Sequence, residues 1–199
     1  MTVSRGRTIF APNPAPDAVF ILETGLVRIY RLSEEGHEFT LNFVKPGEVF
    51  GEMAAFSDQP CDNFAQAIDR CIVLKVPVPA FSELLRSVPE LCFSVTRQIV
   101  QRFKRVMIRT EDLVFRSVAA RLADVLLMLN EDFGDELRGR RFIRVHLSQT
   151  ELATLVGASR PSTNQAFKQF REQGLATFEK GHVVILDLER LRRLAHDDA

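Results

Sequence analysis

The first 76 residues alternate short apolar runs with turns that contain glycine or proline. Pairs such as Thr24-Gly25, Glu35-Gly36 and Pro46-Gly47 separate the runs, which are rich in the β-branched and aromatic residues that strands favour. Regular spacing of short strands is typical of a barrel or a jelly roll. We therefore predict strands at Thr8 to Phe10, Ala18 to Glu23, Leu26 to Leu32, Glu38 to Val44, Phe64 to Ala67 and Cys71 to Val76.

From Val78 onward the apolar pattern takes the period of helices. Val78 to Arg86 predicts a short helix, and Pro89 to about Phe115 predicts a long one. Along the long helix, apolar positions recur at alternating spacings of four and three residues, which is typical of a helix that pairs with another helix. The alternative is that this seam packs on the chain's own barrel. The predicted dimer interface comprises Ile99, Phe103, Val106, Thr110 and Leu113.

A second helical region follows, with one bridging helix at Ser117 to Asn130 and two short helices within Ser148 to Lys168. Ser148 can cap the first of the two, and Gly157 supplies a tight turn. A hydroxyl and an early proline between Ser159 and Pro161 favour the start of the second. This combination predicts a helix-turn-helix, and the alternative is an ordinary helical hairpin with a solvated polar face.

The second of these helices carries side chains that suit a DNA groove. Arginine can bind guanine through two hydrogen bonds, asparagine and glutamine can bind adenine in the same way, and serine or lysine can hold phosphate. The predicted DNA-binding residues are Ser159, Arg160, Ser162, Asn164, Gln165 and Lys168.

Strand patterns on both sides of the helix pair indicate a wing. Leu175 to Glu179 and His182 to Asp187 predict two short strands joined by Lys180 and Gly181. Phe142 to Leu147, preceded by Arg138, Arg140 and Arg141, predicts a strand that enters the module, and Leu188 to His196 predicts a closing helix. The C-terminal region is therefore predicted to be a winged helix-turn-helix.

Charge is unevenly distributed along a chain of otherwise ordinary globular composition, with 46% hydrophobic and 26% charged residues in 199. The segment from Arg138 to Ala199 holds 11 basic and 7 acidic residues, a net charge of +4. Because the whole chain has 26 of each, the remainder has 15 and 19, a net charge of −4. A basic C-terminal region agrees with phosphate binding there.

Cysteine usage and hydropathy exclude several classes of protein. Cys61, Cys71 and Cys92 are odd in number and lack C-x-x-C spacing, which argues against a disulfide framework, a zinc site and an iron-sulfur cluster. There is no apolar run of about 18 residues and no N-terminal apolar signal segment. We therefore predict a cytoplasmic protein that has no membrane association, metal or cofactor.

The order of these parts resembles the Crp/Fnr family of bacterial transcription regulators over nearly the whole chain. The matching stretches are FILETGLVRIYRLSEEGHE from Phe20, KPGEVFGEMAAF from Lys45, RSVAARLADVLL from Arg116, the helix-turn-helix from Ser148, and HVVILDLERLRRLA from His182. The resemblance implies an α+β fold with a cyclic-nucleotide-binding-like jelly roll over 1–88, a dimerisation helix over 89–116 and a winged helix-turn-helix over 117–199. It also implies a homodimer that binds a two-fold symmetric promoter site in double-stranded DNA, with RNA polymerase as a partner.

The same resemblance implies that Arg160 occupies the position of the family arginine that reads guanine. Pro161 stands where relatives have a glutamate that accepts from cytosine, and Gln165 stands where they have an arginine. Proline cannot hydrogen-bond a base edge, and glutamine pairs with adenine sooner than with guanine. We therefore predict a DNA sequence preference that differs from that of the relatives.

In relatives that bind cyclic AMP, the glutamate of a Gly-Glu pair holds the ribose, and an arginine helps to hold the phosphate. Gly51 and Glu52 match the pair, but the arginine position falls on Cys61, or on Asp62 if the alignment shifts by one residue. In the same relatives, two residues of the long helix face the base with hydroxyl groups. Here these positions correspond to Val106 and Met107, which offer no hydrogen bonds. The predicted vestigial effector pocket comprises Gly51, Glu52, Cys61, Asp62, Val106 and Met107.

A phosphodiester in this pocket is expected to bind poorly, because no Lys or Arg occurs from Pro46 to Asp69 and Asp58 and Asp62 lie nearby in sequence. Loss of a charge-assisted phosphate contact typically costs about 1.5 to 3 kcal/mol, or about tenfold to a hundredfold in affinity. We therefore expect DNA binding that does not need cyclic AMP. The alternative is a regulator whose barrel binds a cyclic nucleotide through a distant residue such as Arg70, or binds another small molecule.

Two classes other than a regulator are also open to test. A metal-dependent enzyme of the cupin type needs two or three histidines and a carboxylate inside the barrel, and His37 is the only histidine in that region. We therefore predict no catalytic residues and, for the same reason, no axial haem ligand. A protein-interaction module that has lost DNA binding is the other class, and a gel shift on random DNA distinguishes it.

Overall fold

The computed structural model describes residues 1–12, 17–36, 38–57, 61–137, 140–179 and 181–196. The chain divides into two units, Met1–Ile108 and Arg109–Ala199. None of the helices in the described segments has the length and apolar character that a membrane crossing requires.

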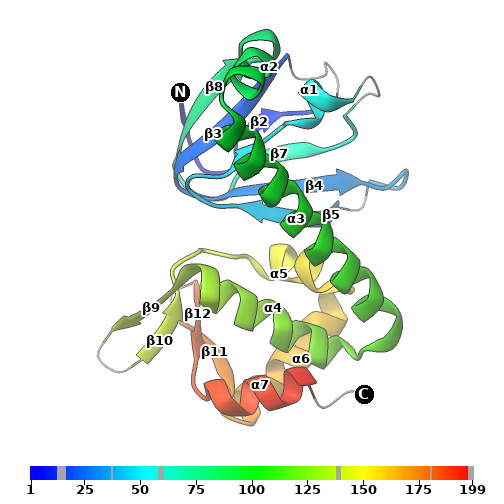
Figure 1. Cartoon of the computed structure of the whole chain (residues 1–199). Coiled ribbons are helices and arrows are strands. Elements are labelled where there is room, and N and C mark those ends of the chain that lie inside the picture. The colour runs from blue at the N-terminus through cyan, green and yellow to red at the C-terminus, as the bar shows by residue number, and fades with distance from the viewer. Residues whose placement is uncertain (13–16, 37, 58–60, 138–139, 180, 197–199) are drawn as a thin grey trace. The chain divides into compact units, whose positions relative to one another are not determined.

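Within the described segments, the first unit contains two antiparallel four-stranded sheets that face each other (Figure 1). The strands are β1 (Thr2–Val3), β2 (Thr8–Phe10), β3 (Ala18–Thr24), β4 (Val27–Leu32), β5 (Glu38–Val44), β6 (Val49–Phe50), β7 (Phe64–Ala67) and β8 (Cys71–Pro77). One sheet has the order β1-β8-β3-β6, and the other has the order β2-β7-β4-β5. The predicted jelly roll is confirmed.

The core of this barrel is aromatic and lies between the two sheets. Phe10, Phe20 and Phe50 stack with ring centroids 5.4 to 6.2 Å apart. Gly51 has φ +73°, and a Cβ atom there would lie 3.0 Å from the Phe20 ring. Glycine at position 51 therefore provides both the turn after β6 and the space for the aromatic stack.

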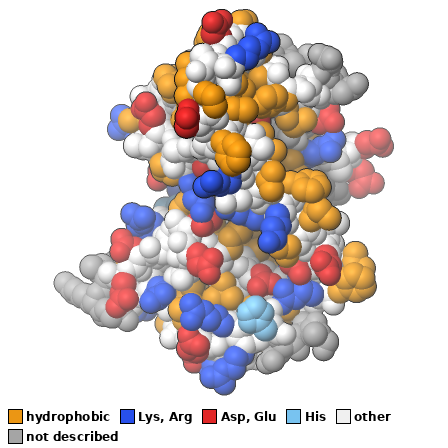
Figure 2. Space-filling model, in the orientation of Figure 1, with side chains coloured by type: hydrophobic (Ala, Val, Ile, Leu, Met, Phe, Trp, Pro, Cys, Tyr) orange, Lys and Arg blue, Asp and Glu red, His pale blue; other side chains and the backbone are white. Residues whose placement is uncertain are grey.

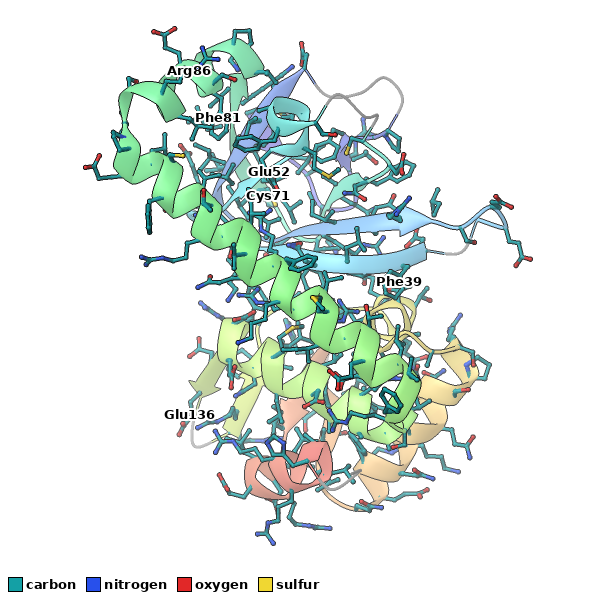
Figure 3. All side chains as sticks on the ribbon, turned by 45° about the vertical axis from the view of Figure 1, so that its right-hand side comes forward. Phe39, Glu52, Cys71, Phe81, Arg86 and Glu136 are labelled. Atoms are coloured by element: carbon teal, nitrogen blue, oxygen red, sulfur yellow. The ribbon has the colours of Figure 1, made fainter. Side chains whose placement is uncertain are left out.

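Three helices complete the first unit and lead out of it: α1 (Met53–Phe56), α2 (Val78–Ser87) and α3 (Pro89–Phe115). Phe81 of α2 is 1% exposed and packs in a second apolar cluster with Val19, Val49 and Val95 (Figure 3). This cluster fastens α2 and the first turns of α3 to the sheet that contains β3 and β6. The sequence had not predicted β1, β6 or α1, which are only two to four residues long.

The second unit builds a helical core and a small antiparallel sheet with the order β11-β12-β10-β9. Leu122, Leu126 and Leu129 of its first helix are fully buried. The elements are α4 (Val118–Phe133), β9 (Gly134–Leu137), β10 (Arg140–Ile143), α5 (Gln149–Val156), α6 (Arg160–Glu172), β11 (Ala176–Glu179), β12 (His182–Ile185) and α7 (Leu188–His196). The predicted winged helix-turn-helix is confirmed.

The strand predicted at Phe142 to Leu147 is wrong in its bounds, because β10 ends at Ile143. Val145 and Leu147 are buried and alternate with exposed residues, which imitates a strand in the sequence. The Arg144 N–H instead donates to the Phe133 carbonyl at 2.9 Å, so the chain leaves the sheet there. Arg140 and Arg141 lie within β10, and Arg138 lies outside the described residues.

Candidate DNA-binding interface and effector pocket

Local capping chemistry defines the helix-turn-helix. At the start of α5, the Ser148 hydroxyl accepts from the Glu151 N–H at 3.1 Å, while the Glu151 carboxylate accepts from the Ser148 N–H at 2.7 Å. At its end, Gly157 adopts the left-handed conformation with φ +65°. The Ser159 hydroxyl then accepts from the Ser162 N–H at 3.2 Å and caps α6. The turn between the two helices is therefore set by residues at the predicted positions.

The last turns of α3 belong to the second unit and pack on this turn. The Arg109 side chain donates to the Leu155 carbonyl at 2.5 Å, and burial lowers the pKa of its guanidinium. A Cβ atom on Gly157 would lie 2.5 Å from Leu113, which shows how closely α3 approaches the turn. Leu113, predicted at the dimer interface, therefore contacts the helix-turn-helix of its own chain.

Helix α6 has one buried face and one polar face. Thr163, Ala166, Phe167 and Phe170 are buried against the unit's core. Of the predicted DNA-binding residues, Asn164 is half-buried, and the others are exposed: Ser159, Arg160, Ser162, Gln165 and Lys168. The buried face therefore holds α6 against the unit's core, and the polar, basic face is exposed, as in a helix that enters the major groove of DNA.

Some of these polar groups already have partners within α6. The hydroxyls of Ser159 and Ser162 lie 2.8 Å apart, and the Lys168 ammonium lies 3.8 Å from the Glu172 carboxylate. Gln169 is also exposed on α6, although it is not among the predicted DNA-binding residues. By contrast, the exposed Arg160 guanidinium forms no hydrogen bond or ion pair within the described residues.

The wing follows α6 as the β11–β12 hairpin, and β10 lies beside β12. The Arg140 guanidinium pairs with the Glu179 carboxylate at 2.5 Å, which joins β10 to the hairpin. The rings of His146 and His182 stack with centroids 4.4 Å apart. Lys180, predicted at the tip of the wing, lies outside the described residues.

The first unit contains a cavity of about 330 Å³ between the barrel and α3. Four predicted pocket residues line it: Gly51, Glu52, Cys61 and Val106. The other two lie elsewhere, because Asp62 pairs with Arg31 at 2.8 Å and Met107 is 57% exposed, and neither is part of the cavity wall. Asp58 and His37 lie outside the described residues.

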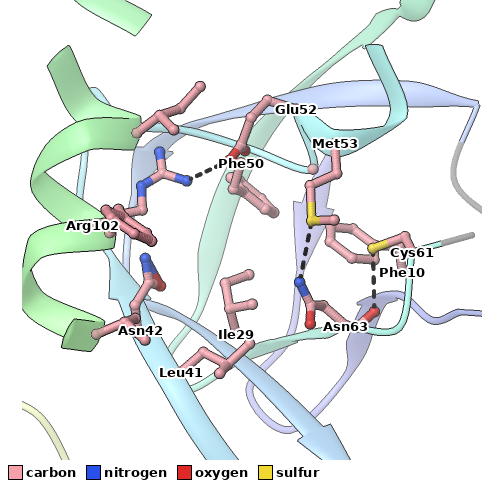
Figure 4. A pocket seen from close by; sticks show the side chains of 14 residues that line it. Phe10, Ile29, Leu41, Asn42, Phe50, Glu52, Met53, Cys61, Asn63 and Arg102 are labelled. Carbon is pink, nitrogen blue, oxygen red and sulfur yellow. Dashed lines mark hydrogen bonds and ion pairs between the residues drawn. The ribbon is translucent and has the colours of Figure 1, made fainter. Parts of the chain in front are cut away.

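A cation, Arg102, lines this cavity, although the sequence from Pro46 to Asp69 contains no basic residue and predicted none there. Arg102 of α3 donates to the Glu52 carboxylate at 3.1 Å and also to the Val49 carbonyl (Figure 4). One turn earlier, the side-chain Oε1 of Gln98 accepts from the Val49 N–H at 2.9 Å. These residues clamp α3 to the end of β6. Arg102 lies 50 residues after Glu52 in the sequence, so the lack of basic residues between Pro46 and Asp69 gave no sign of it.

Replacement of Arg102 by methionine is expected to lower the free energy of unfolding by about 2 kcal/mol, because it leaves the largely buried Glu52 carboxylate and the Val49 carbonyl without their donor. The Arg102 and Glu52 side chains are 13% and 15% exposed, so water compensates little of this loss. Urea denaturation measures the effect. Arg97→Met is the control, since Arg97 is exposed on the same helix, and equal losses in both variants would contradict the clamp.

Helix α3 has two apolar stripes rather than one. Val95 and Ile99 pack in the cluster below α2, and Val106 lines the cavity, so this stripe faces the chain's own barrel. A second stripe is exposed, with Phe93, Val100, Met107 and Val114 placed seven residues apart. Phe103 and Thr110, both predicted at the dimer interface, are also exposed and alternate along the helix with Val100, Met107 and Val114. Hydrophobic side chains follow the line of α3 on the face shown in Figure 2.

Comparisons with known proteins match both halves of the chain. The model of the cyclic nucleotide-binding domain matches residues 1–88, and that of the Crp-like helix-turn-helix domain matches residues 120–194. The chain is 33% identical to the CRP-like cAMP-activated global transcriptional regulator of Mycobacterium tuberculosis, over 96% of this chain and 85% of that one. It is 27% identical to the global nitrogen regulator of Nostoc sp., over 92% and 83%.

A solved structure agrees with these matches. The chain superimposes on TTHA1359, a transcriptional regulator of the CRP/FNR family from Thermus thermophilus, with a TM-score of 0.84. Sequence identity is 27%, and the match covers 100% of this chain and 99% of the other.

Proposed function

Since the chain belongs to the Crp/Fnr family and is a DNA-binding transcription regulator of that type, we propose that it binds an inverted-repeat promoter site as a homodimer without needing cyclic AMP. In this proposal residues 1–88 form the effector domain, 89–116 the dimerisation helix and 117–199 the DNA-binding domain. The protein acts in the cytoplasm, and RNA polymerase is the partner that we expect at the promoter.

The exposed polar face of α6 is the observation that carries the proposal. Arg160 and Gln165 lie on that face, while Phe167 and Phe170 anchor the helix from behind. An anchored helix with a free guanidinium near its N-terminus is suited to base contacts in the major groove. Two such helices related by a two-fold axis read half-sites about one helical turn apart, which predicts an inverted repeat.

The homodimer is supported by the exposed stripe of α3. A spacing of seven residues keeps Phe93, Val100 and Met107 on one side of the helix, as in a two-stranded coiled coil. Phe103 and Thr110 lie at the intermediate positions of the same pattern. We therefore propose an interface centred on these residues, in which Ile99, Val106 and Leu113 serve mainly packing within the protomer.

Independence from cyclic AMP is supported by the walls of the cavity. By the family resemblance, the phosphate-binding arginine corresponds to Cys61, or to Asp62 if the alignment shifts by one residue, and neither side chain is a cation. Cys61 and Val106 line the cavity, and the Val106 side chain offers no hydrogen bond to a base. Arg102 does not replace the missing arginine, because Glu52 and the Val49 carbonyl already hold two of its nitrogens. A ligand shifts the equilibrium between two conformations of a protein only by the difference in its affinity for them. A nucleotide that binds both conformations weakly therefore shifts this equilibrium little.

The proposal predicts that the apo protein selects a defined inverted repeat from random DNA. Titration of the selected fragment, labelled with a fluorophore, should then give the same dissociation constant within about twofold with or without millimolar cyclic AMP or cyclic GMP. A tightening of about tenfold with either nucleotide would overturn cyclic AMP independence. The variant Cys61→Arg tests the cause, because restored nucleotide binding would identify the missing arginine as the reason.

A further inference from the structure

We infer that Arg109, near the end of α3, is a positioning residue for base recognition, because it fixes the turn of the helix-turn-helix and thereby the placement of α6. This role rests on the proposed function, since it concerns how the recognition helix of that regulator is held. It gives sequence specificity a determinant outside the predicted DNA-binding residues.

Arg109 satisfies a carbonyl group that α5 leaves without a partner of its own. The last four carbonyls of a helix have no acceptor role within that helix. At the end of α5, the N–H groups of Gly157 and Ala158 both donate to the Ala153 carbonyl. The Leu155 carbonyl instead accepts from the Arg109 guanidinium at 2.5 Å. The helix dipole also favours a cation at this end, so Arg109 caps α5 from another helix.

Two residues of α3, four positions apart and therefore on one face, hold this turn. Arg109 is half-buried, and burial lowers the pKa of its guanidinium, so water is a poor substitute for its bond to the Leu155 carbonyl. Leu113 packs on the other part of the turn, where a Cβ atom on Gly157 would lie 2.5 Å from its side chain. Together they fix the end of α5 and the left-handed residue that follows it.

The end of α3 is itself firmly joined to α4, which follows it after a sharp turn of the chain (Figure 1). The Arg121 guanidinium of α4 donates to the Leu113 carbonyl at 3.1 Å and to the Arg116 carbonyl at 3.3 Å. The Arg116 guanidinium also pairs with the Asp124 carboxylate. Arg109 and Leu113 are therefore presented by a segment that is fixed to the core of the second unit.

The turn that Arg109 holds determines where Arg160 lies, because α6 begins three residues after Gly157. Hydrogen bonds to a base edge require donor–acceptor distances within a few tenths of about 2.9 Å and good alignment. Attraction to phosphates is long-ranged and tolerates larger shifts. A loosened turn should therefore weaken base recognition much more than general attraction to DNA.

The variant Arg109→Met tests this role, because it removes the donor and keeps a long side chain. It should bind the selected inverted repeat about tenfold more weakly than the native protein, and a fragment with the repeat scrambled within about twofold of it. Lys104→Met is the matched control, since Lys104 is an exposed cation on the same helix. Each variant loses one positive charge, so the control should leave the ratio of the two affinities unchanged.

Two further measurements, made well below the melting temperature of each variant, separate positioning from a loss of stability. In two-dimensional NMR of the full chain, the amide resonances of Gly157 and Ala158 should shift in Arg109→Met and not in Lys104→Met. In the Arg160→Ala background, the effect of Arg109→Met on the inverted repeat should shrink from about tenfold to about twofold, because the base contact that it misplaces is already absent.

The role of Arg109 is refuted if Arg109→Met keeps the native affinity for the inverted repeat, or if it weakens binding to both fragments equally. It is also refuted if Lys104→Met changes the ratio of affinities as much, if the two amide resonances do not move, or if the effect is undiminished in Arg160→Ala. A native protein that binds no inverted repeat would refute the proposed function instead.

Discussion

Val100→Glu is expected to convert the protein from a dimer to monomers and to abolish specific DNA binding. Val100 is 59% exposed and lies between Phe93 and Met107 in the exposed stripe of α3, whose members are spaced seven residues apart. In a two-fold interface the substitution places two carboxylates close together against apolar side chains. Burial of unpaired charges at such a place costs at least about 3 kcal/mol, or more than a hundredfold in the dimer dissociation constant.

Light scattering after size-exclusion chromatography at micromolar concentration measures the effect. Gln101→Glu is the matched control, because it introduces the same carboxylate at an exposed neighbouring position outside the stripe. The control should remain dimeric. A native protein that is monomeric under these conditions, or a Val100→Glu protein that stays dimeric, would refute the proposed interface.

The helix-turn-helix was predicted accurately because its determinants are local. The cap at Ser148, the left-handed Gly157 and the cap at Ser159 each act within a few residues of the chain. The barrel strands were predicted for a related reason, since buried and exposed positions alternate within each strand and glycine or proline separates them. The predicted bounds of these barrel strands differ from the observed ones by at most one residue.

Long-range contacts account for most of what the sequence did not reveal. Arg102 and Glu52 are 50 residues apart, and nothing in either segment predicts their ion pair. Asn42 lies on β5 among residues whose pattern predicts only a strand. The residues that line the cavity were therefore predicted only where the family resemblance indicated them, at Gly51, Glu52, Cys61 and Val106.

Periodicity alone also could not assign the faces of α3. Apolar residues spaced by four and three predict a stripe, but Val95 is buried against the chain's own barrel while Phe93, two residues earlier, is 74% exposed. A helix that packs on a domain on one side and on a partner on the other carries two overlapping stripes. Phe103 belongs to both, because it lines the cavity and is still largely exposed.

Arg160→Ala is expected to weaken binding to the selected inverted repeat and to relax the preference at one base pair of each half-site. A bidentate contact between arginine and guanine contributes about 1 to 3 kcal/mol of discrimination, so affinity should fall about fivefold to 150-fold for each half-site. The exposed position of Arg160 beside the capped start of α6 gives its guanidinium access to a base edge without loss of an internal contact.

Lys168→Ala and Arg192→Ala separate base recognition from charge. Lys168 lies on the exposed face of α6, 3.8 Å from Glu172. Its removal should weaken binding to all DNA sequences about equally, and should reduce the slope of log affinity against log salt concentration by about one. Arg192 lies on α7 and pairs with Glu189 at 2.7 Å, so its removal should change neither affinity nor motif appreciably.

Only Arg160→Ala should alter the motif recovered from random DNA, because only a base contact carries sequence information. A motif that is unchanged in Arg160→Ala would assign recognition to another residue of α6, with exposed Gln165 and Gln169 as the next to replace.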